Sequence, residues 1–228
     1  LNVRGAIMNS CNYYFAEMGY RMGMDTLRKY YADFGLGLPT GIEIGDAAGR
    51  LPSQNEGENL APWAAFGQAN QLYTPLQLAN YIATLSGGGD RYATHLLKNV
   101  RESGTGALEY VYDAEPVQTI AMSEENLSAV LAGMHDLATD GAVSSYFKDC
   151  IVDAAAKTGT VQTGDTKNNN GAFVCFAPYD DPQIAVAIVI EHATWGSNLA
   201  TTGVDILNAY FTADETGSAV TGENQLLP

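Results

Sequence analysis

The sequence is poor in positive charge and in long apolar runs. Its 228 residues contain 11 Lys and Arg against 26 Asp and Glu, which gives a net charge of −15. This excludes bulk attraction to nucleic acid or to an anionic membrane surface, so any anion must be captured by a local cluster. The longest apolar run, IAVAIVI at 184–190, is far too short to span a bilayer.

Cysteine and histidine are also scarce. The cysteines form no CxxC pair and the histidines have no metal-ligand spacing; these residues are Cys11, Cys150, Cys175, His95, His135 and His192. We therefore expect free thiols that are buried or half-buried, no metal site and no other cofactor. The chain starts with LNVRGA, without an initiator methionine, and we expect it to be a piece of a longer protein.

The residues that are present predict helices followed by a strand-rich end. Helices are expected at 12–23, at 24–37 with Asp25 as N-cap and Gly35 as stop, at 74–89 after Thr74, at 123–140 after Ser123, at 141–150 and at 198–211. Residues 36–73 are rich in Gly, Pro, Asn and Gln and predict a long irregular segment, which in a compact domain is usually functional.

A strand is expected at 152–163, a turn at 164–171, and a hairpin at 172–192 that turns at PYDDP. Consecutive strands joined by short turns indicate an antiparallel sheet, and the helices are expected to flank it. The predicted fold class is therefore α+β. No repeat and no linker divides the chain into two cores.

The stretch AAAKTGTVQT places a lysine, Lys157, in an apolar strand. An unpaired charge is costly to bury, so this lysine either points to solvent or meets an anion. Lys157 and Gly159 share one face of the strand and Thr158 and Thr160 the other. An ammonium group, two hydroxyls and a free backbone N–H near Thr160 would suit a carboxylate and an oxyanion. The alternative is that the lysine only protects a sheet edge from aggregation.

The pattern K-[ST]-G-[ST] is expected only about 0.01 times by chance in this composition. In penicillin-recognising serine enzymes such a strand accompanies S-x-N and S-x-x-K motifs. Ser10-Cys11-Asn12 is the favoured S-x-N, because it precedes a helix. The second match, SQN at 53–55, lies in the irregular stretch.

With these motifs the chain resembles the transpeptidase domain of class B penicillin-binding proteins. The segments NSCNYYF, FGLGLPTGIEI, GRLPS, FGQANQLYTPLQLANYIATLSGGG and AKTGTVQT occur in the family's order. Ala156 replaces a usual glycine before Lys157, and Ala69 follows Gln68 where the family often has glycine. The resemblance implies a β-lactamase/transpeptidase-like fold over 1–212. The composition of residues 213–228 separately predicts a weakly ordered tail.

The resemblance also implies a reaction, which is peptidoglycan D,D-transpeptidation through a serine acyl-enzyme. Lys157 would supply positive field, Ser10 would relay a proton, and Asn12 would hydrogen-bond the substrate backbone. The hydroxyls of Thr158 and Thr160 would bind the substrate carboxylate, and the Thr160 N–H would form half of an oxyanion hole. Gly159 would let the substrate approach the strand.

The family's nucleophilic serine belongs to an S-x-x-K that precedes S-x-N, and no serine lies before Ser10 here. The formal match Ser145 to Lys148 is out of order, and we reject Ser145 as the nucleophile. A helix that packs Tyr146 and Phe147 against the sheet explains it better. We therefore expect a C-terminal portion of the domain that lacks the nucleophile, is incomplete at its N-terminus and is inactive alone.

The implied parent would lie on the extracytoplasmic face of a bacterial membrane, held by an N-terminal anchor. Its partners would be D-Ala-D-Ala stem peptides, β-lactam antibiotics and other cell-wall synthesis proteins, and not nucleic acid. Two alternatives stay open: a serine β-lactamase, which would add a deacylating base, and a non-catalytic β-lactam sensor or interaction domain.

Overall fold

The computed structural model describes residues 1–54, 60–162 and 169–215. Its helices are α1 (Val3–Met8), α2 (Asn12–Asp33), α3 (Leu60–Ala65), α4 (Pro75–Ser86), α5 (Glu124–Thr139), α6 (Ser144–Phe147), the 3-10 helix η1 (Gly196–Leu199) and α7 (Ala200–Glu215). Its strands are β1 (Asp90–Tyr92), β2 (Asn99–Arg101), β3 (Leu108–Val111), β4 (Pro116–Thr119), β5 (Ala155–Val161), β6 (Asn170–Ala177) and β7 (Ile184–Ile190).

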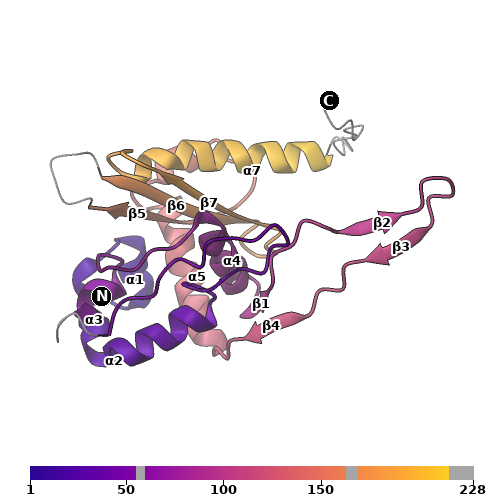
Figure 1. Cartoon of the computed structure of the whole chain (residues 1–228). Helices are drawn as coiled ribbons and strands as arrows, with labels where there is room; N and C mark the ends of the chain where they lie inside the picture. Colours follow the sequence, from indigo (N-terminus) through magenta and orange to yellow (C-terminus); the bar gives the residue numbers. More distant parts are fainter. Residues whose placement is uncertain (55–59, 163–168, 216–228) are drawn as a thin grey trace.

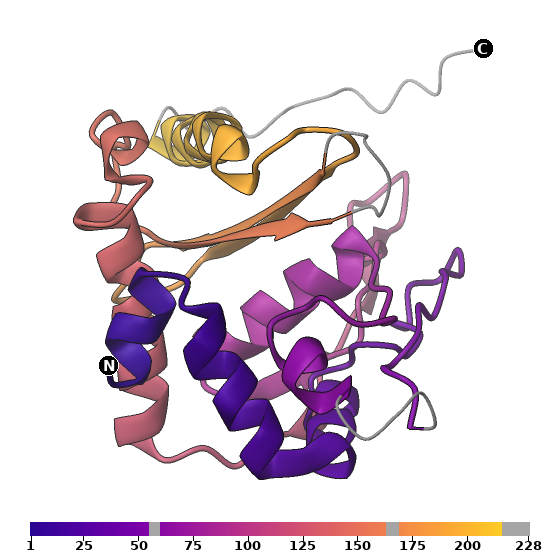
Figure 2. The same cartoon turned by 90° about the vertical axis from the view of Figure 1, so that its left-hand side faces the viewer.

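A three-stranded antiparallel sheet in the order β5-β6-β7 forms the centre of the molecule. Helix α7 covers one face, and α1, α4 and α5 lie on the other, as Figure 2 shows edge-on. Alternate residues of β5 supply the two cores: Ala156 packs with the α7 layer and Ala155 with the α4 and α5 layer. The α+β fold with an antiparallel sheet flanked by helices is confirmed.

The start of α4 organises the irregular segment before it. Thr74 and Gln77 form a reciprocal capping box, and the buried Gln77 side chain also donates to the backbone carbonyls of Leu38 and Ala48 at 2.6 and 2.7 Å. The TPLQLA stretch is therefore an architectural motif that ties the 36–50 loop to the body.

Two sequence predictions for helix boundaries need correction. The boundary expected between the helices at 12–23 and 24–37 is present as a break at Gly23, whose φ of 75° and ψ of 165° leave the helical region, but Asp25 is not the N-cap of the second helix. Asp25 lies within the helical turn that follows and accepts a hydrogen bond from Gln54. The first residues of the tail expected from residue 213 are helical, since α7 continues to Glu215. Residues 216–228 and most of the 164–171 turn lie outside the described residues.

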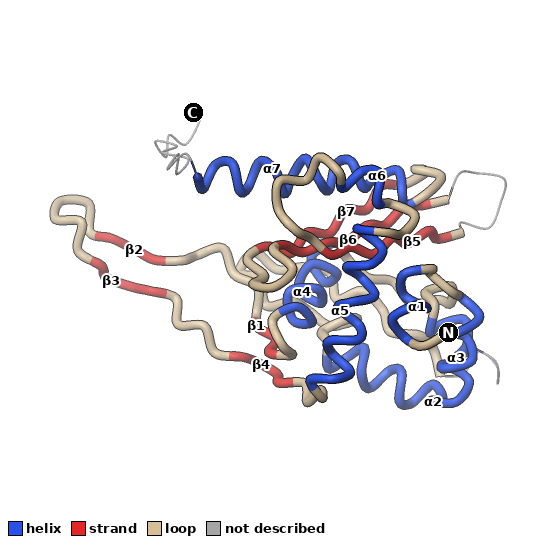
Figure 3. Tube along the Cα trace, turned by 180° about the vertical axis from the view of Figure 1, so that it is seen from behind, coloured by secondary structure: helices blue, strands red, loops and turns tan. Residues whose placement is uncertain are grey.

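The segment between α4 and α5 was not assigned from the sequence, and it forms an arm. Strand β1 pairs with β4 at its base, and β2 pairs with β3 further out. Figures 1 and 3 show β2 and β3 extending away from the body, and every residue of these two strands is exposed. No helix in the described ranges is both long and apolar enough to cross a bilayer.

Candidate active site

Strand β5 presents a free edge on which Lys157 lies. Along its whole length β5 pairs with β6, and the described part of the chain adds no strand on its other side. Lys157 points to the same face as Ala155, toward α1, α4 and α5. Because the strand is held by seven residue pairs with β6, the position of this lysine is fixed by the sheet.

Helix α1 brings Ser10 to this lysine from 147 residues away in the chain. The Lys157 ammonium donates to Ser10 Oγ at 2.8 Å and to the backbone carbonyl of Thr158 at 2.7 Å. Both partners are neutral oxygens. An ammonium and a hydroxyl in direct contact can pass a proton between them, which is the elementary requirement of a proton relay.

Ser10 adopts a left-handed backbone conformation, with φ of 48°. The N–H of Ser10 donates to Ile7 O at 3.1 Å and the N–H of Cys11 donates to Ala6 O at 2.9 Å. These two bonds define a Schellman motif with Ser10 at the position where glycine is usual. A side chain there is strained, and the left-handed backbone conformation sets the direction in which the side chain leaves the chain.

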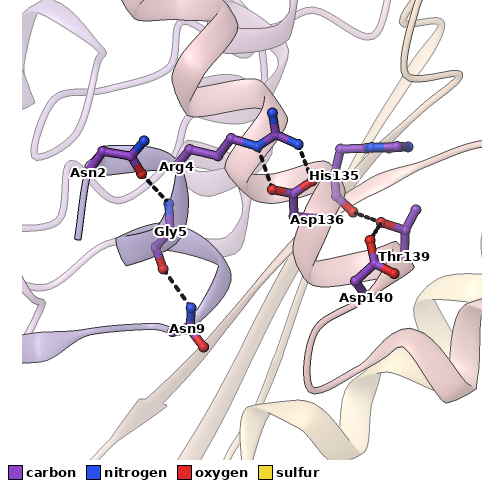
Figure 4. A network of polar contacts seen from close by, with 8 residues as sticks. All are labelled: Asn2, Arg4, Gly5, Asn9, His135, Asp136, Thr139 and Asp140. Atoms are coloured by element: carbon purple, nitrogen blue, oxygen red, sulfur yellow. Dashed lines mark hydrogen bonds and ion pairs between the residues drawn. The ribbon is translucent and has the colours of Figure 1, made fainter.

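Helix α1 packs against helix α5 (Figure 4). The Arg4 guanidinium makes a bidentate ion pair with Asp136, at 2.6 and 2.8 Å, and Asn2 caps the helix by accepting from Gly5 N. A Cβ on Gly133 would lie 2.7 Å from Arg4 O, so only glycine allows the two helices to approach this closely. These contacts hold the short α1, and with it Ser10, against the body.

Burial lowers the pKa of Lys157 from its ordinary value to about 8. No Asp or Glu of the described residues forms an ion pair with it. The positive charge of the ammonium is therefore poorly compensated: the buried lysine meets neutral oxygens and no described carboxylate. It can attract an external anion, and near neutral pH it can also give up its proton.

The backbone of Thr160 faces the free edge. Its carbonyl accepts from Gln68 Nε2 at 2.8 Å, so it points away from β6. In a strand the N–H and C=O of one residue point to the same side, so the Thr160 N–H also faces outward and can donate to an incoming oxygen. The Thr160 hydroxyl oxygen accepts from Gly196 N at 3.1 Å, which leaves its hydrogen free to donate.

The other predicted site residues lie nearby with fewer contacts. Asn12 is the exposed first residue of α2, two positions after Ser10, and no described contact joins it to Lys157. Gly159 leaves room on its face, since the nearest described atom to a Cβ there would be Ala172 Cβ at 3.4 Å. The close backbone approach occurs on the other face, where a Cβ on Gly196 would clash with Gly159 O. The roles assigned to Asn12, Thr158 and Gly159 stay predictions.

Ser145 and Lys148 lie away from this site. They belong to α6 and its C-terminal cap, and Figure 3 shows α6 beside α7, on the opposite side of the sheet from α1. Phe147 packs into the α7-side core, 6.4 Å from the Phe173 ring, as expected. Tyr146 does not pack against the sheet: it is 39% exposed.

Sequence reasoning missed two contributors to the edge. Gln68 was noticed only as part of a family-like segment, and Gly196 was not noticed. Both contact Thr160 of β5, across 92 and 36 residues, and no local sequence pattern around either of them indicates a contact with this strand. No group of described residues has the composition of a metal site.

An edge strand that carries K-T-G-T, with a serine hydroxyl on its lysine and an outward backbone N–H, defines the class of penicillin-recognising serine acyl-transfer proteins. The family model for the penicillin binding protein transpeptidase domain matches residues 1–209, and the chain belongs to this family. The resemblance inferred from the motifs is confirmed, and its homologues are class B penicillin-binding proteins.

Among its relatives, Penicillin-binding protein 2A of Bacillus subtilis is 33% identical over 73% of this chain and 25% of its own length. Peptidoglycan D,D-transpeptidase MrdA of Haemophilus influenzae is 30% identical over 86% of this chain and 34% of its own length. The solved structure of penicillin-binding protein 2B from Streptococcus pneumoniae matches with a TM-score of 0.83 and 26% identity, over 92% of this chain and 39% of that one. The chain thus spans about a quarter to a third of the curated relatives it matches.

Proposed function

We propose that this chain forms the substrate-binding side of a peptidoglycan D,D-transpeptidase. One observation carries the proposal: the 2.8 Å contact between Lys157 and Ser10, beside the outward backbone of Thr160. The name of the Haemophilus influenzae relative, a peptidoglycan D,D-transpeptidase, supports it. The substrate would be a stem peptide that ends in D-Ala-D-Ala.

The proposed reaction is acyl transfer through a serine ester. The serine oxygen attacks the penultimate D-Ala carbonyl carbon, a C–O bond forms, and the C–N bond to the terminal D-Ala breaks. The proton lost by the serine ends on the departing amine nitrogen, with Ser10 and Lys157 as the relay. An acceptor amine then attacks the ester carbonyl carbon: the new C–N bond forms, the ester C–O bond breaks, and a proton of the amine returns to the serine oxygen.

The remaining groups would stabilise charge. The Thr160 N–H would donate to the carbonyl oxygen as it becomes negative. The Lys157 ammonium and the hydroxyls of Thr158 and Thr160 would hold the terminal carboxylate. Asn12, two positions after Ser10, would donate to the peptide backbone. β-Lactams would bind in the same way, because they also present a carbonyl and a carboxylate.

We propose that the reacting serine is supplied by a segment outside these 228 residues. The family order of motifs leaves no candidate inside the chain, and Ser145 is on the wrong side of the sheet. The complete protein would act on the extracytoplasmic face of a bacterial membrane, anchored by a segment outside this chain, beside other cell-wall synthesis proteins.

A fluorescent penicillin tests this. The complete protein should form a stoichiometric adduct, and mass spectrometry should locate it on a serine outside this sequence, whereas the 228-residue chain alone should form none. An adduct on Ser145 or Ser10 would refute the assignment. Cross-linking of a D-Ala-D-Ala peptide to an amine distinguishes a transpeptidase from a sensor, and slow hydrolysis of the adduct distinguishes it from a β-lactamase.

A further inference from the structure

Gln68 is delivered to the β5 edge by the end of helix α3. The N–H of Gly67 donates to Ala64 O at 3.0 Å and the N–H of Gln68 donates to Trp63 O at 2.9 Å, which is again a Schellman motif. The backbone of Gln68 is thereby anchored, while its partly exposed side chain reaches β5, 92 residues further along the chain.

The Gln68 amide occupies one of the two hydrogen-bonding groups that Thr160 presents outward. A carbonyl can only accept, so the side-chain nitrogen faces it, at 2.8 Å. A peptide that adds to a free strand edge pairs with both the N–H and the C=O of such a residue. With Gln68 in place the donor of Thr160 is available and the acceptor is taken.

We propose that Gln68 is a specificity-determining gate on the Thr160 carbonyl. Its side-chain amide occupies the position that the amide N–H beside the reacting carbonyl of a substrate would take. This inference rests on the proposed function. A ligand with an amide N–H beside its reacting carbonyl must displace Gln68 to pair with β5. A ligand without that N–H gains nothing by displacing it.

The contact is suited to reversible displacement. A hydrogen bond between two neutral groups contributes little net stability in water-accessible surroundings, because each group finds water when it opens. The Gln68 side chain is not fully buried, so an opened amide can be solvated. Because the backbone stays anchored by the α3 end, the side chain returns when the ligand leaves.

The test measures second-order acylation of the complete protein by two probes. Benzylpenicillin carries an acylamino N–H, and a penicillanic acid sulfone with no substituent at that carbon lacks it, while both carry the β-lactam carbonyl and the ring carboxylate. We expect Gln68→Ala to raise the benzylpenicillin rate about fivefold and to leave the sulfone rate unchanged. Gln68→Met, with similar length and no donor, should act in the same way if the smaller residue disturbs folding.

Gln71→Ala is the matched control, because Gln71 lies in the same loop and donates to Ala64 O at 2.9 Å without reaching β5. The ratio of the benzylpenicillin rate to the sulfone rate should be the same in Gln71→Ala as in the unmodified protein. Equal changes with both probes, or a slower benzylpenicillin reaction in both Gln68 variants, would overturn the gate and leave the proposed function standing. Failure of the unmodified protein to react with either probe would overturn both.

Discussion

The ends of α1 and α3 are built alike and differ at one residue. Each helix ends in a Schellman motif, and each delivers a side chain to the β5 edge: Ser10 to the Lys157 ammonium and Gln68 to the Thr160 carbonyl. In α3 the left-handed position is taken by Gly67, with φ of 83°, and its neighbour makes the contact. In α1 the left-handed residue itself, Ser10, makes the contact.

The two helix ends differ in strain, because glycine adopts the left-handed conformation freely and Ser10 does not. Helices α2 and α4 end in the same motif with Gly35 and Gly88 at the left-handed position. Ser10 is the exception among these four ends, and a side chain there costs roughly 1–2 kcal/mol. Strain of this kind persists where surrounding structure imposes it and function requires it. The packing of α1 against α5 imposes it, and the proposed use is the hydroxyl that it places beside Lys157.

The largest expected effect is on the rate of acylation and comes from removing Lys157, the residue that Ser10 contacts. In the complete protein, Lys157→Ala should slow acylation by a β-lactam by about a hundred- to a thousandfold, since an oxyanion-type contact is worth roughly 3–4 kcal/mol. Its melting temperature should stay equal or rise, because a poorly compensated charge is removed. Lys157→Arg should restore little, because the planar guanidinium is larger than the ammonium it replaces.

Lys148→Ala, which removes the exposed lysine that caps the C-terminus of α6, is the control for this variant and should behave like the unmodified protein. Near-normal acylation by Lys157→Ala, accompanied by aggregation, would mean that the lysine only guards the sheet edge.

A second effect separates the strain at Ser10 from its chemistry. Ser10→Ala and Ser10→Gly both remove the hydroxyl, and each should slow acylation about a hundredfold. Only the glycine relieves the left-handed strain, so Ser10→Gly should be more stable than Ser10→Ala by about 0.5–1 kcal/mol after the entropy of the unfolded chain is counted. Urea unfolding of the two variants measures this, and equal stability would contradict the strain argument.

A third effect concerns pH. Between pH 8 and its ordinary value of 10.5, Lys157 holds fewer protons in the folded than in the unfolded chain, because burial lowers its pKa to about 8. The free energy of unfolding should therefore rise with pH across this window, by about 2 kcal/mol between pH 7 and pH 10. Lys157→Met lacks the titrating group, so the rise should be absent from it. A parallel dependence in both proteins would show that this lysine is not desolvated.

The smallest expected effect comes from Gly67→Ala, which introduces left-handed strain at the end of α3. Among the described residues, no atom other than those of its chain neighbours lies within 4 Å of a Cβ on Gly67, so Gly67→Ala adds left-handed strain without a clash there. It should lower the free energy of unfolding by about 1 kcal/mol and change acylation little. Gly104→Ala, equally open but without a left-handed backbone, should leave stability almost unchanged. A large loss of acylation in Gly67→Ala would mean that the α3 end positions more of the site than Gln68.

Much of the fold and part of the site follow from local pattern. The caps at Thr74 and Ser123, the stop at Gly35 and the hairpin between β6 and β7 were all predicted. The boundary between the helices expected at 12–23 and 24–37 is present as the break at Gly23, but its cap was placed two residues too late, because Asp is a stronger N-cap signal than Gly. The arm between α4 and α5 was not predicted, because its short strands carry no alternation of buried and exposed residues.

The sequence by itself determined which chemical groups the site contains. Lys157 and the threonines stand in a rare motif, and the two-residue period of a strand decides which of them share a face. Only the tertiary structure decided what these groups meet. Helix α1 packs against Gly133 and Asp136 of α5, and this brings Ser10 into contact with Lys157. The end of α3 brings Gln68 into contact with Thr160. The physical reason is that backbone period acts over a few residues, whereas contacts across 92 and 147 residues depend on how whole helices pack against the sheet.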